Sequence, residues 1–403
     1  MQIQPPAYND ITKENLSSHQ LKIKQTLNCA SFIALDTEFT GLGNKESNTK
    51  ASNIEERYIN LSKVVKSHAL VAFGVTVFEE IVEKEETTSP LEKQYNVYNF
   101  NFTLLSQVDH IISPQSLAFL SDTGFDFNKQ IRKGIPYFPG KDQQHDANDS
   151  NAILRSIFSH IISHNLNTFV ADLNEMFSGG IFDTKYIADY ITREKSSFLS
   201  YLFRKYEREQ VERKASGNKD YLLLRIHDCI VLPSTTVEIL KSEQFELAKI
   251  SNFQNKPSKR SQGNSYCEQY ALHGFCSQRM RCGKSHDLDF ILDEQAREFE
   301  NKRKQHVSVS MPPTLLPSTK PDQFDTYHSA HFDAYMTGFI FARQLLKYSG
   351  TKVLNEYRNK LYLMGRNLPL LVAKSQFSKT IGKVGKVGQF GNALRDVLPF
   401  LIE

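Results

Sequence analysis

Short apolar runs separated by polar stretches mark the first third of the chain. Residues 32–35 form an unbroken apolar run that suits a buried strand and is too short for an isolated helix. Two further strands are expected over 69–78 and 95–105, and an amphipathic helix is expected over 11–28. The charged stretch 79–93 is typical of a solvated hairpin tip. Strands and helices in this order predict an α/β fold.

The rest of the chain alternates expected helices with polar, linker-like stretches. Helical spacing of apolar residues recurs in five segments, at 114–120, 149–159, within 181–208, at about 289–304 and at 328–347. Short strands are expected at 161–162, 362–364 and 368–372. Loops, linkers or tail are expected at 44–56, 124–140, 209–265 and 381–392, where glycine and polar residues accumulate.

Two acidic residues follow the first apolar run at a spacing of two. Side chains alternate along a strand, so Asp36 and Glu38 leave from the same face. Gly41 and Gly43 then allow the chain to turn sharply. Mg²⁺ and Mn²⁺ prefer carboxylate oxygens, which makes the pair a candidate for a divalent-cation site. Taken alone, an Asp-x-Glu pair is usually just a solvated strand end.

The composition is that of a chain with ample material for a core. The length of 403 residues suits two or three domains, and 40% of the residues are hydrophobic, including 28 Phe. No apolar run approaches membrane-spanning length and the N-terminus lacks a signal pattern, so a soluble, intracellular protein is expected. The net charge of +4 does not by itself indicate a nucleic-acid partner. Between Lys256 and His286, however, six Lys or Arg residues accompany one acidic residue, Glu268.

Three of the five cysteines lie in one short segment that also holds a histidine. Cys267, Cys276, Cys282 and His286 together offer a complete tetrahedral shell for structural Zn²⁺. This clustering favours metal binding in a reducing compartment over a disulfide scaffold. The segment is too small to hold a core, so it is expected to fold only with its metal.

The spacing of these four residues closely resembles that of CCCH zinc fingers. In that family, aromatic side chains near the ligands stack on single-stranded RNA bases. The resemblance therefore implies Tyr270 and Phe275 as RNA-binding residues. Lys284 replaces the aromatic residue usual just before the histidine, and it is grouped with them as an RNA-binding candidate.

A third acidic candidate lies at the start of the helical segment 328–347. His328 precedes Asp333 by five residues, a spacing that a helix cap and a solvated pair also explain. The strand ending Asp-Thr-Glu-Phe and the later His-x4-Asp-Ala-Tyr-x-Thr-Gly together resemble the DEDD-type 3′ exonucleases with histidine, and more narrowly the poly(A)-specific ribonuclease family. Supporting similarities lie at 119–137, 164–165, 183–185 and 372–377.

The resemblance implies a ribonuclease H-like exonuclease fold with an inserted CCCH zinc finger. The nuclease domain would comprise 1–250 and 315–380, with the finger at 262–290 and a tail at 381–403. Asp36, Glu38 and Asp333 would be ligands of two Mg²⁺ ions, and His328 would be the general base.

The function implied is that of a 3′-to-5′ exoribonuclease, a deadenylase, that trims 3′ tails of RNA. Nuclear small noncoding RNAs are the implied substrates and a homodimer the implied assembly, with no membrane partner. The nucleus is the expected compartment and the cytoplasm a second one, and Lys302-Arg-Lys304 is a weak candidate for nuclear import.

One block of the family pattern is missing. A fourth carboxylate should follow His-Asn as His-Asn-Gly-x-x-Asp, but His164-Asn165 continues directly into Leu166 and a stretch that resembles the next block of the family. Asp172, within that next block, is the available stand-in. Either the sequence lacks an in-frame coding segment between Asn165 and Leu166, which we favour, or the protein is a degenerate nuclease that serves as an RNA-binding scaffold.

Overall fold

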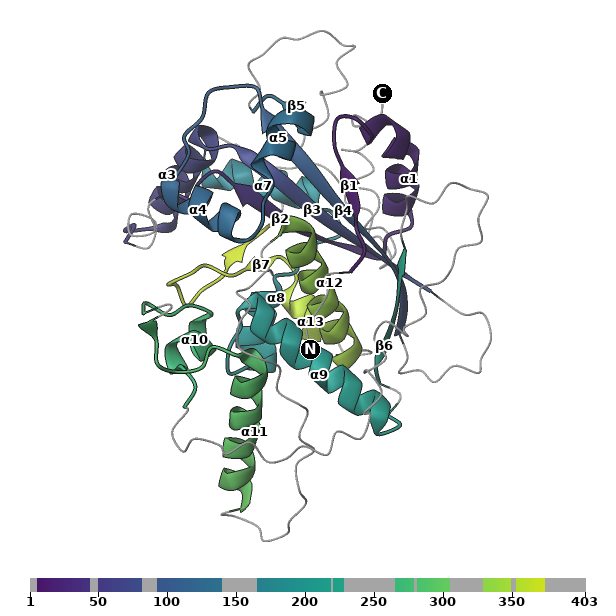
Figure 1. The fold of residues 1–403 in the computed structure, drawn as a ribbon, viewed down its shortest axis with the longest axis vertical. Helices are drawn as coiled ribbons and strands as arrows, with labels where there is room; N and C mark the ends of the chain where they lie inside the picture. The colour runs from purple at the N-terminus through teal and green to yellow at the C-terminus, as the bar shows by residue number, and fades with distance from the viewer. Residues whose placement is uncertain are drawn as a thin grey trace.

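The computed structural model places a mixed six-stranded sheet at the centre of the molecule (Figure 1). It describes residues 6–43, 50–81, 93–139, 165–218, 220–227, 265–278, 281–304, 329–348 and 353–373. The expected α/β class is confirmed by this sheet and by the helices that pack on both of its faces. Within the described residues, no helix is both long enough and apolar enough to span a bilayer.

Three long strands form an antiparallel meander that carries the rest of the sheet. They are β2 (Phe32–Phe39), β3 (Leu70–Glu80) and β4 (Lys93–Ser106). Three short strands pair in parallel with β4: β1 (Asn9–Ile11), β5 (Ile135–Tyr137) and β6 (Leu222–His227). The outer edge of β2 has no strand partner among the described residues.

Two apolar clusters cover the two faces of the sheet. Phe78 of β3 lies in the cluster with α9 (Leu199–Ala215) and α12 (Ala330–Lys347), whereas its neighbour Val77 lies in the cluster with α1 (Leu16–Asn28). This follows from the alternation of side chains along a strand. Helix α12 is apolar nearly all round and is almost completely buried, which makes it the central helix of the molecule.

The remaining elements are short or peripheral. They are α3 (Ile54–Ser67), α4 (Pro114–Asp122), α5 (Phe127–Lys133), α7 (Leu166–Met176), α8 (Thr184–Ile187), the π-helix η1 (Ala188–Thr192), α10 (Glu268–His273), α11 (Leu288–Lys304), α13 (Val353–Tyr357), β7 (Lys360–Leu361) and β8 (Leu370–Leu371). The β7–β8 pair forms a separate small antiparallel sheet.

Most of the expected long elements are confirmed. The strands expected at 32–38, 69–78 and 95–105 and the helices expected at 114–120, 181–208, 289–304 and 328–347 all appear within a few residues of their expected bounds. Of the late strands, the one expected at 368–372 is confirmed only over Leu370–Leu371, and the one expected at 362–364 was wrong: β7 ends at Leu361 and the chain turns directly after it. The expected tip at 79–93, the helix at 149–159, the strand at 161–162 and the tail at 381–392 lie largely or wholly outside the described residues.

Four other expectations were wrong, in each case because local polar chemistry or sheet pairing shaped the backbone. The helix expected from residue 11 begins only at Leu16, since the Asn15 side chain bonds to the backbone of Thr12 and Asp10. The loop expected at 44–56 overlaps the start of α3, which the Asn53 side chain caps. The loop expected at 124–140 contains α5 and β5, and the linker expected at 209–265 contains the end of α9 and strand β6.

Candidate active site and a second metal site

Strand β2 and helix α12 bring three carboxylates together. One carboxylate oxygen each from Asp36, Glu38 and Asp333 lies within 4.8 Å of the others. Asp36 and Glu38 project from the same face of β2, and α12 packs across β2 and β3 so that Asp333, in its first turn, lies over them. The three carboxylates were grouped by the sequence resemblance although Asp333 lies far from the other two along the chain, and the structure shows that they are neighbours in space.

The electrostatics of this group suit a divalent cation. Burial, together with the nearby charges of Asp333 and Glu38, raises the pKa of Asp36 to about 8. Ionising all three carboxylates at neutral pH therefore requires a compensating positive charge. Because carboxylate oxygens are the preferred ligands of Mg²⁺ and Mn²⁺, the residues present fit such an ion.

Two further residues, His328 and Asp172, were candidates for the active site. His328 lies outside the described residues, so its role as general base stays a prediction. Asp172 lies on α7 and is not part of the acidic group, which holds three carboxylates among the described residues. His331, the other histidine at the start of α12, is buried and its ring stacks on Tyr8 at a centroid distance of 3.7 Å.

The cysteine-rich segment forms a second candidate metal site. One ligand atom each from Cys267, Cys276, Cys282 and His286 lies within 4.8 Å of the others. The Nε2 atom of His286 is buried and has no hydrogen-bond partner in the described part of the chain, as expected for a nitrogen that faces a metal. Gly274 ends α10 with φ = 67°, a conformation that brings the chain back toward the site. Three thiols and one imidazole fit tetrahedral Zn²⁺.

The RNA-binding candidates around this site differ in their exposure. Tyr270 is only 8% exposed, with its ring stacked on His286 at 4.6 Å and edge-on to Phe198 at 5.9 Å. Because the side chain is buried and one ring face lies against His286, the structure does not support base stacking by Tyr270. Phe275 is 55% exposed and Lys284 is also exposed, which leaves both accessible to a ligand.

The apolar core beneath the second site extends beyond the expected finger. Cys267, Tyr270, Ala271 and Cys276 cluster with Ile291 of α11 and with Phe198, just before α9. The boundaries 262–290 therefore cut through this cluster. The Ser196 hydroxyl also donates to the Leu272 carbonyl at 2.9 Å, which ties α10 to the segment before α9.

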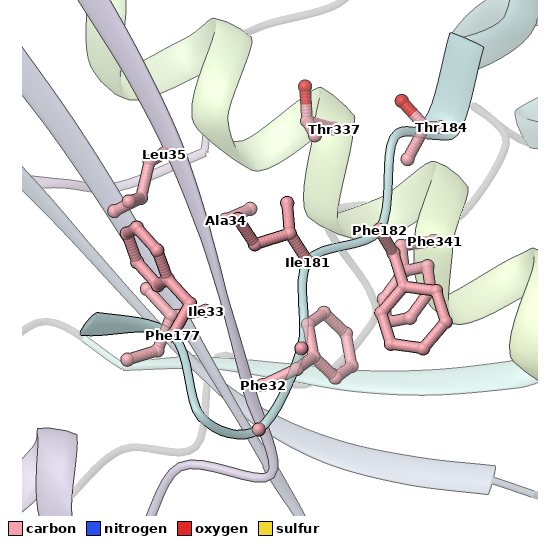
Figure 2. Close-up of a pocket in the computed structure, with 12 residues that line it drawn as sticks. Phe32, Ile33, Ala34, Leu35, Phe177, Ile181, Phe182, Thr184, Thr337 and Phe341 are labelled. Atoms are coloured by element: carbon pink, nitrogen blue, oxygen red, sulfur yellow. The ribbon is translucent and has the colours of Figure 1, made fainter. Parts of the chain in front are cut away.

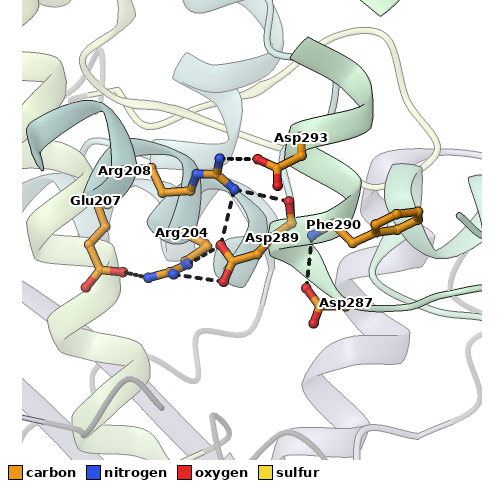
Figure 3. Close-up of polar contacts among 7 residues, drawn as sticks. All are labelled: Arg204, Glu207, Arg208, Asp287, Asp289, Phe290 and Asp293. Carbon is orange, nitrogen blue, oxygen red and sulfur yellow. Dashed lines mark hydrogen bonds and ion pairs between the residues drawn. The ribbon is translucent and has the colours of Figure 1, made fainter. Parts of the chain in front are cut away.

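A network of ion pairs fastens α11 to α9 (Figure 3). The Arg204 guanidinium donates to both carboxylate oxygens of Asp289, at 2.7 and 2.8 Å, and to Glu207 at 2.7 Å. Arg208, one turn further along α9, donates to the Asp289 carbonyl at 3.1 Å and pairs with Asp293. Because α9 packs on α12, the second site and the acidic site belong to one packed body.

Sequence reasoning overlooked this network although a signal was present. Arg204 and Arg208 are four residues apart on one helix, and Asp289 and Asp293 are four residues apart on another. Residues at this spacing lie on the same helix face, so the two pairs could have predicted that α9 and α11 pack together.

An apolar cavity of about 220 Å³ lies beside the acidic group (Figure 2). It runs along residues 32–35, at the outer edge of β2, and is closed by the 177–182 segment after α7 and by α12. Thr337, one turn after Asp333, and Leu35, next to Asp36, both line it. Sequence reasoning gave no indication of this cavity, which forms from three separate segments.

An α/β sheet that gathers three carboxylates at the end of a strand and the start of a helix is an arrangement suited to metal-dependent phosphoryl transfer. The sequence profile of the CAF1 family ribonucleases matches residues 11–153 and 147–341. The chain therefore belongs to the CAF1 family of ribonucleases.

Several known proteins are similar to part of this chain. It is 31% identical over 147 residues to poly(A)-specific ribonuclease PARN of Bos taurus, covering 34% of this chain and 22% of that protein. It is 25% identical over 193 residues to the pre-piRNA 3′-exonuclease trimmer of Bombyx mori, covering 44% of this chain and 34% of that protein. The Mg²⁺- and Mn²⁺-bound structure of S. pombe Pop2p aligns with 50% of this chain and 83% of that chain, with a TM-score of 0.33 and 16% identity. The matches thus span about a third or less of the length of the curated relatives cited here.

Proposed function

We propose that this chain is a Mg²⁺-dependent 3′-to-5′ exoribonuclease that trims 3′ tails of RNA, with adenosine tails as the preferred substrate. The observation that carries the proposal is the convergence of Asp36, Glu38 and Asp333 in a member of the CAF1 ribonuclease family. The matched relatives named as a poly(A)-specific ribonuclease and a pre-piRNA 3′-exonuclease support an RNA 3′ end as the substrate.

The three carboxylates would hold two divalent cations, which supply charge neutralisation for in-line displacement at phosphorus. Asp36 and Glu38 present their oxygens from the rigid strand β2, and Asp333 presents its oxygen from α12. Asp36 must lose its proton to act as a ligand, which its raised pKa opposes until positive charge is nearby. His328 would accept the proton of the attacking water.

The second site would hold one structural Zn²⁺ and form a CCCH finger, fixed to the nuclease body through α11. Phe275 would stack on a base of single-stranded RNA and Lys284 would contact the RNA beside it. This finger makes the chain resemble the member of the poly(A)-specific ribonuclease family known as target of early growth response protein. By that resemblance we propose nuclear small noncoding RNAs as substrates, the nucleus and also the cytoplasm as compartments, and a homodimer as the assembly.

The fourth carboxylate would come from an in-frame segment between Asn165 and Leu166. Two observations support this idea: the acidic group holds three carboxylates among the described residues, and an apolar cavity runs along the strand edge of β2 that lacks a partner there. Both are what loss of a packed element would leave. Sequencing the transcript across this join tests the idea, and a mature message that joins the two codons directly would favour the RNA-binding scaffold instead.

Attack from an end can be distinguished from internal cleavage with two RNAs of the same sequence, one circular and one linear with a free 3′ hydroxyl and a label on its 5′ end that reports from which end it shortens. We expect the purified chain with Mg²⁺ to shorten the linear RNA from its 3′ end, release 5′-nucleotides and leave the circle intact. Cleavage of the circle would contradict an exonuclease. Binding of both RNAs without shortening would favour the scaffold function.

A further inference from the structure

Gly74 occupies the position of β3 that faces the start of α12. In the register of the sheet it pairs directly with Asp36 of β2. Residues directly opposite each other on antiparallel strands project from the same face. A side chain at position 74 would therefore point to the same side as the Asp36 carboxylate, toward α12.

There is no room for such a side chain. A Cβ atom at position 74 would lie 1.9 Å from the carbonyl oxygen of Ala330, 2.2 Å from its carbonyl carbon and 2.6 Å from the nitrogen of His331. All three are backbone atoms, so no side-chain rotation can relieve the clash. Gly74 is required by this close approach of two backbones rather than by an unusual φ.

The clash would fall on the turn that carries Asp333. Ala330 is the first residue of α12, and the backbone N–H groups of Phe332 and Asp333 both donate to the Ser329 carbonyl at 2.9 Å. To bring the Ala330 oxygen to an ordinary distance, this turn would have to move by roughly 1 Å or more. Asp333 would move with it, away from Asp36 and Glu38.

The rest of α12 is held in place, so the shift cannot be spread along the helix. Two turns further on, a Cβ atom at Gly338 would lie 2.2 Å from the Phe78 ring, on the same face of β3 as Gly74. Nearly every residue of α12 between these points is buried. The N-terminal turn, where Ser329 is partly exposed, is the end of the helix that can yield.

We propose that Gly74 is a positioning residue for the metal site: it sets the separation between Asp333 on α12 and the Asp36–Glu38 pair on β2. The proposal rests on the proposed function, because it assigns to Gly74 the geometry of the same acidic site. A residue of this kind affects metal affinity through the placement of a ligand that it never touches.

The test compares Gly74→Ala with Gly338→Ala, each of which adds one methyl group between α12 and β3. Mn²⁺ affinity is measured by calorimetry, and thermal stability is measured in metal-free buffer. We expect Gly74→Ala to weaken Mn²⁺ binding at least tenfold, in the range that displaced ligand supports cause. Gly338→Ala meets only a side chain, so it should lower thermal stability while Mn²⁺ affinity stays within about twofold of wild type.

A second measurement asks whether the clash is with the backbone. Adding His331→Ala to Gly74→Ala removes a neighbouring side chain but leaves the clashing atoms, so it should not restore Mn²⁺ affinity. Any of three results would overturn the proposal: restored Mn²⁺ affinity in the double variant, unchanged Mn²⁺ affinity in a folded Gly74→Ala chain, or failure of Gly74→Ala to fold. Because Mn²⁺ binding is measured without RNA, a wild type that binds Mn²⁺ and does not trim RNA refutes the proposed function but not this inference.

Discussion

The acidic group and the cysteine–histidine group differ in how far apart their members lie along the chain. All four residues of the second site come from one stretch between Cys267 and His286, whereas the acidic group joins β2 near the N-terminus to Asp333. Local spacing alone can assemble the cysteine–histidine group once a metal binds. The acidic group exists only when the sheet and α12 are packed together, so its geometry depends on residues far from its three carboxylates.

The two groups also differ in their completeness. Three thiols and an imidazole can fill a tetrahedral shell, whereas the acidic group holds three carboxylates among the described residues, one fewer than the pattern that the sequence resembles. Zinc should therefore strongly stabilise the fold of the segment that binds it. The acidic site should bind its ions weakly, with an affinity that depends markedly on pH. Four predictions examine this contrast.

Removing zinc should have the largest effect. Structural Zn²⁺ contributes about 10–16 kcal/mol to the folding of isolated finger peptides, so chelation of the whole chain should unfold α10 and expose Tyr270. Loss of the bound metal can be followed by atomic absorption and the unfolding by hydrogen exchange. Cys276→Ser should behave like the chelated protein, and Cys29→Ser, at an exposed cysteine outside the site, provides the control. Equal protection of 265–278 with and without zinc would contradict a structural role.

Metal binding at the acidic site should depend on pH. The pKa of Asp36 is raised to about 8, so the metal-free native state keeps a proton that the unfolded state loses near pH 4. The metal-free protein should thus lose stability as the pH rises between these values. A cation must displace this proton, so apparent Mn²⁺ affinity should rise about tenfold per pH unit up to pH 8 and then level off. Calorimetry from pH 6 to 9 measures this, and a flat profile would contradict displacement of a proton from Asp36 by the cation.

Loss of one ion pair should loosen the second site from the nuclease body. Asp289→Asn removes the charge that accepts two hydrogen bonds from Arg204, and hydrogen bonds to charged groups contribute about 1.5–3 kcal/mol. Thermal unfolding and hydrogen exchange of α11 should both report the change. Glu294→Gln on the same helix is the matched control, because Glu294 pairs with Arg297 within α11 and its loss should change stability by less than about 0.5 kcal/mol. Equal effects of the two variants would argue against the network as an anchor.

The smallest effect is expected at the exposed surface beside the cysteine–histidine group. Phe275→Ala should weaken binding of single-stranded RNA by about 1 kcal/mol, roughly fivefold, with unchanged zinc content. Leu272 is similarly exposed, at 51%, and cannot stack, so Leu272→Ala is the control. Fluorescence anisotropy with a labelled RNA distinguishes the two variants, and equal affinities would remove Phe275 from the RNA surface.

The sequence predicted most of the long elements and the residues that gather at the two candidate metal sites, but not the packing that joins them. An unbroken apolar run sufficed to find β2, and period-two alternation placed Asp36 and Glu38 on one face, since both rules depend on neighbouring residues only. Strands β1, β5 and β6 were missed because they are short and stabilised by pairing with β4. The burial of Tyr270 could not be anticipated either, because Phe198, which covers it, lies far away in the sequence.

The proposed role of the acidic group is to hold the cations that support RNA cleavage, and Asp36→Asn tests this role most directly. An amide of nearly the same shape is a poor ligand for Mg²⁺, whereas RNA affinity should rest on basic and aromatic side chains elsewhere. Wild type and Asp36→Asn should therefore be compared on an adenosine-tailed RNA with Mg²⁺, with RNA binding measured in parallel. We expect wild type to shorten the tail, Asp36→Asn to leave it intact, and the two proteins to bind RNA equally within about twofold. Undiminished trimming by Asp36→Asn would contradict this role.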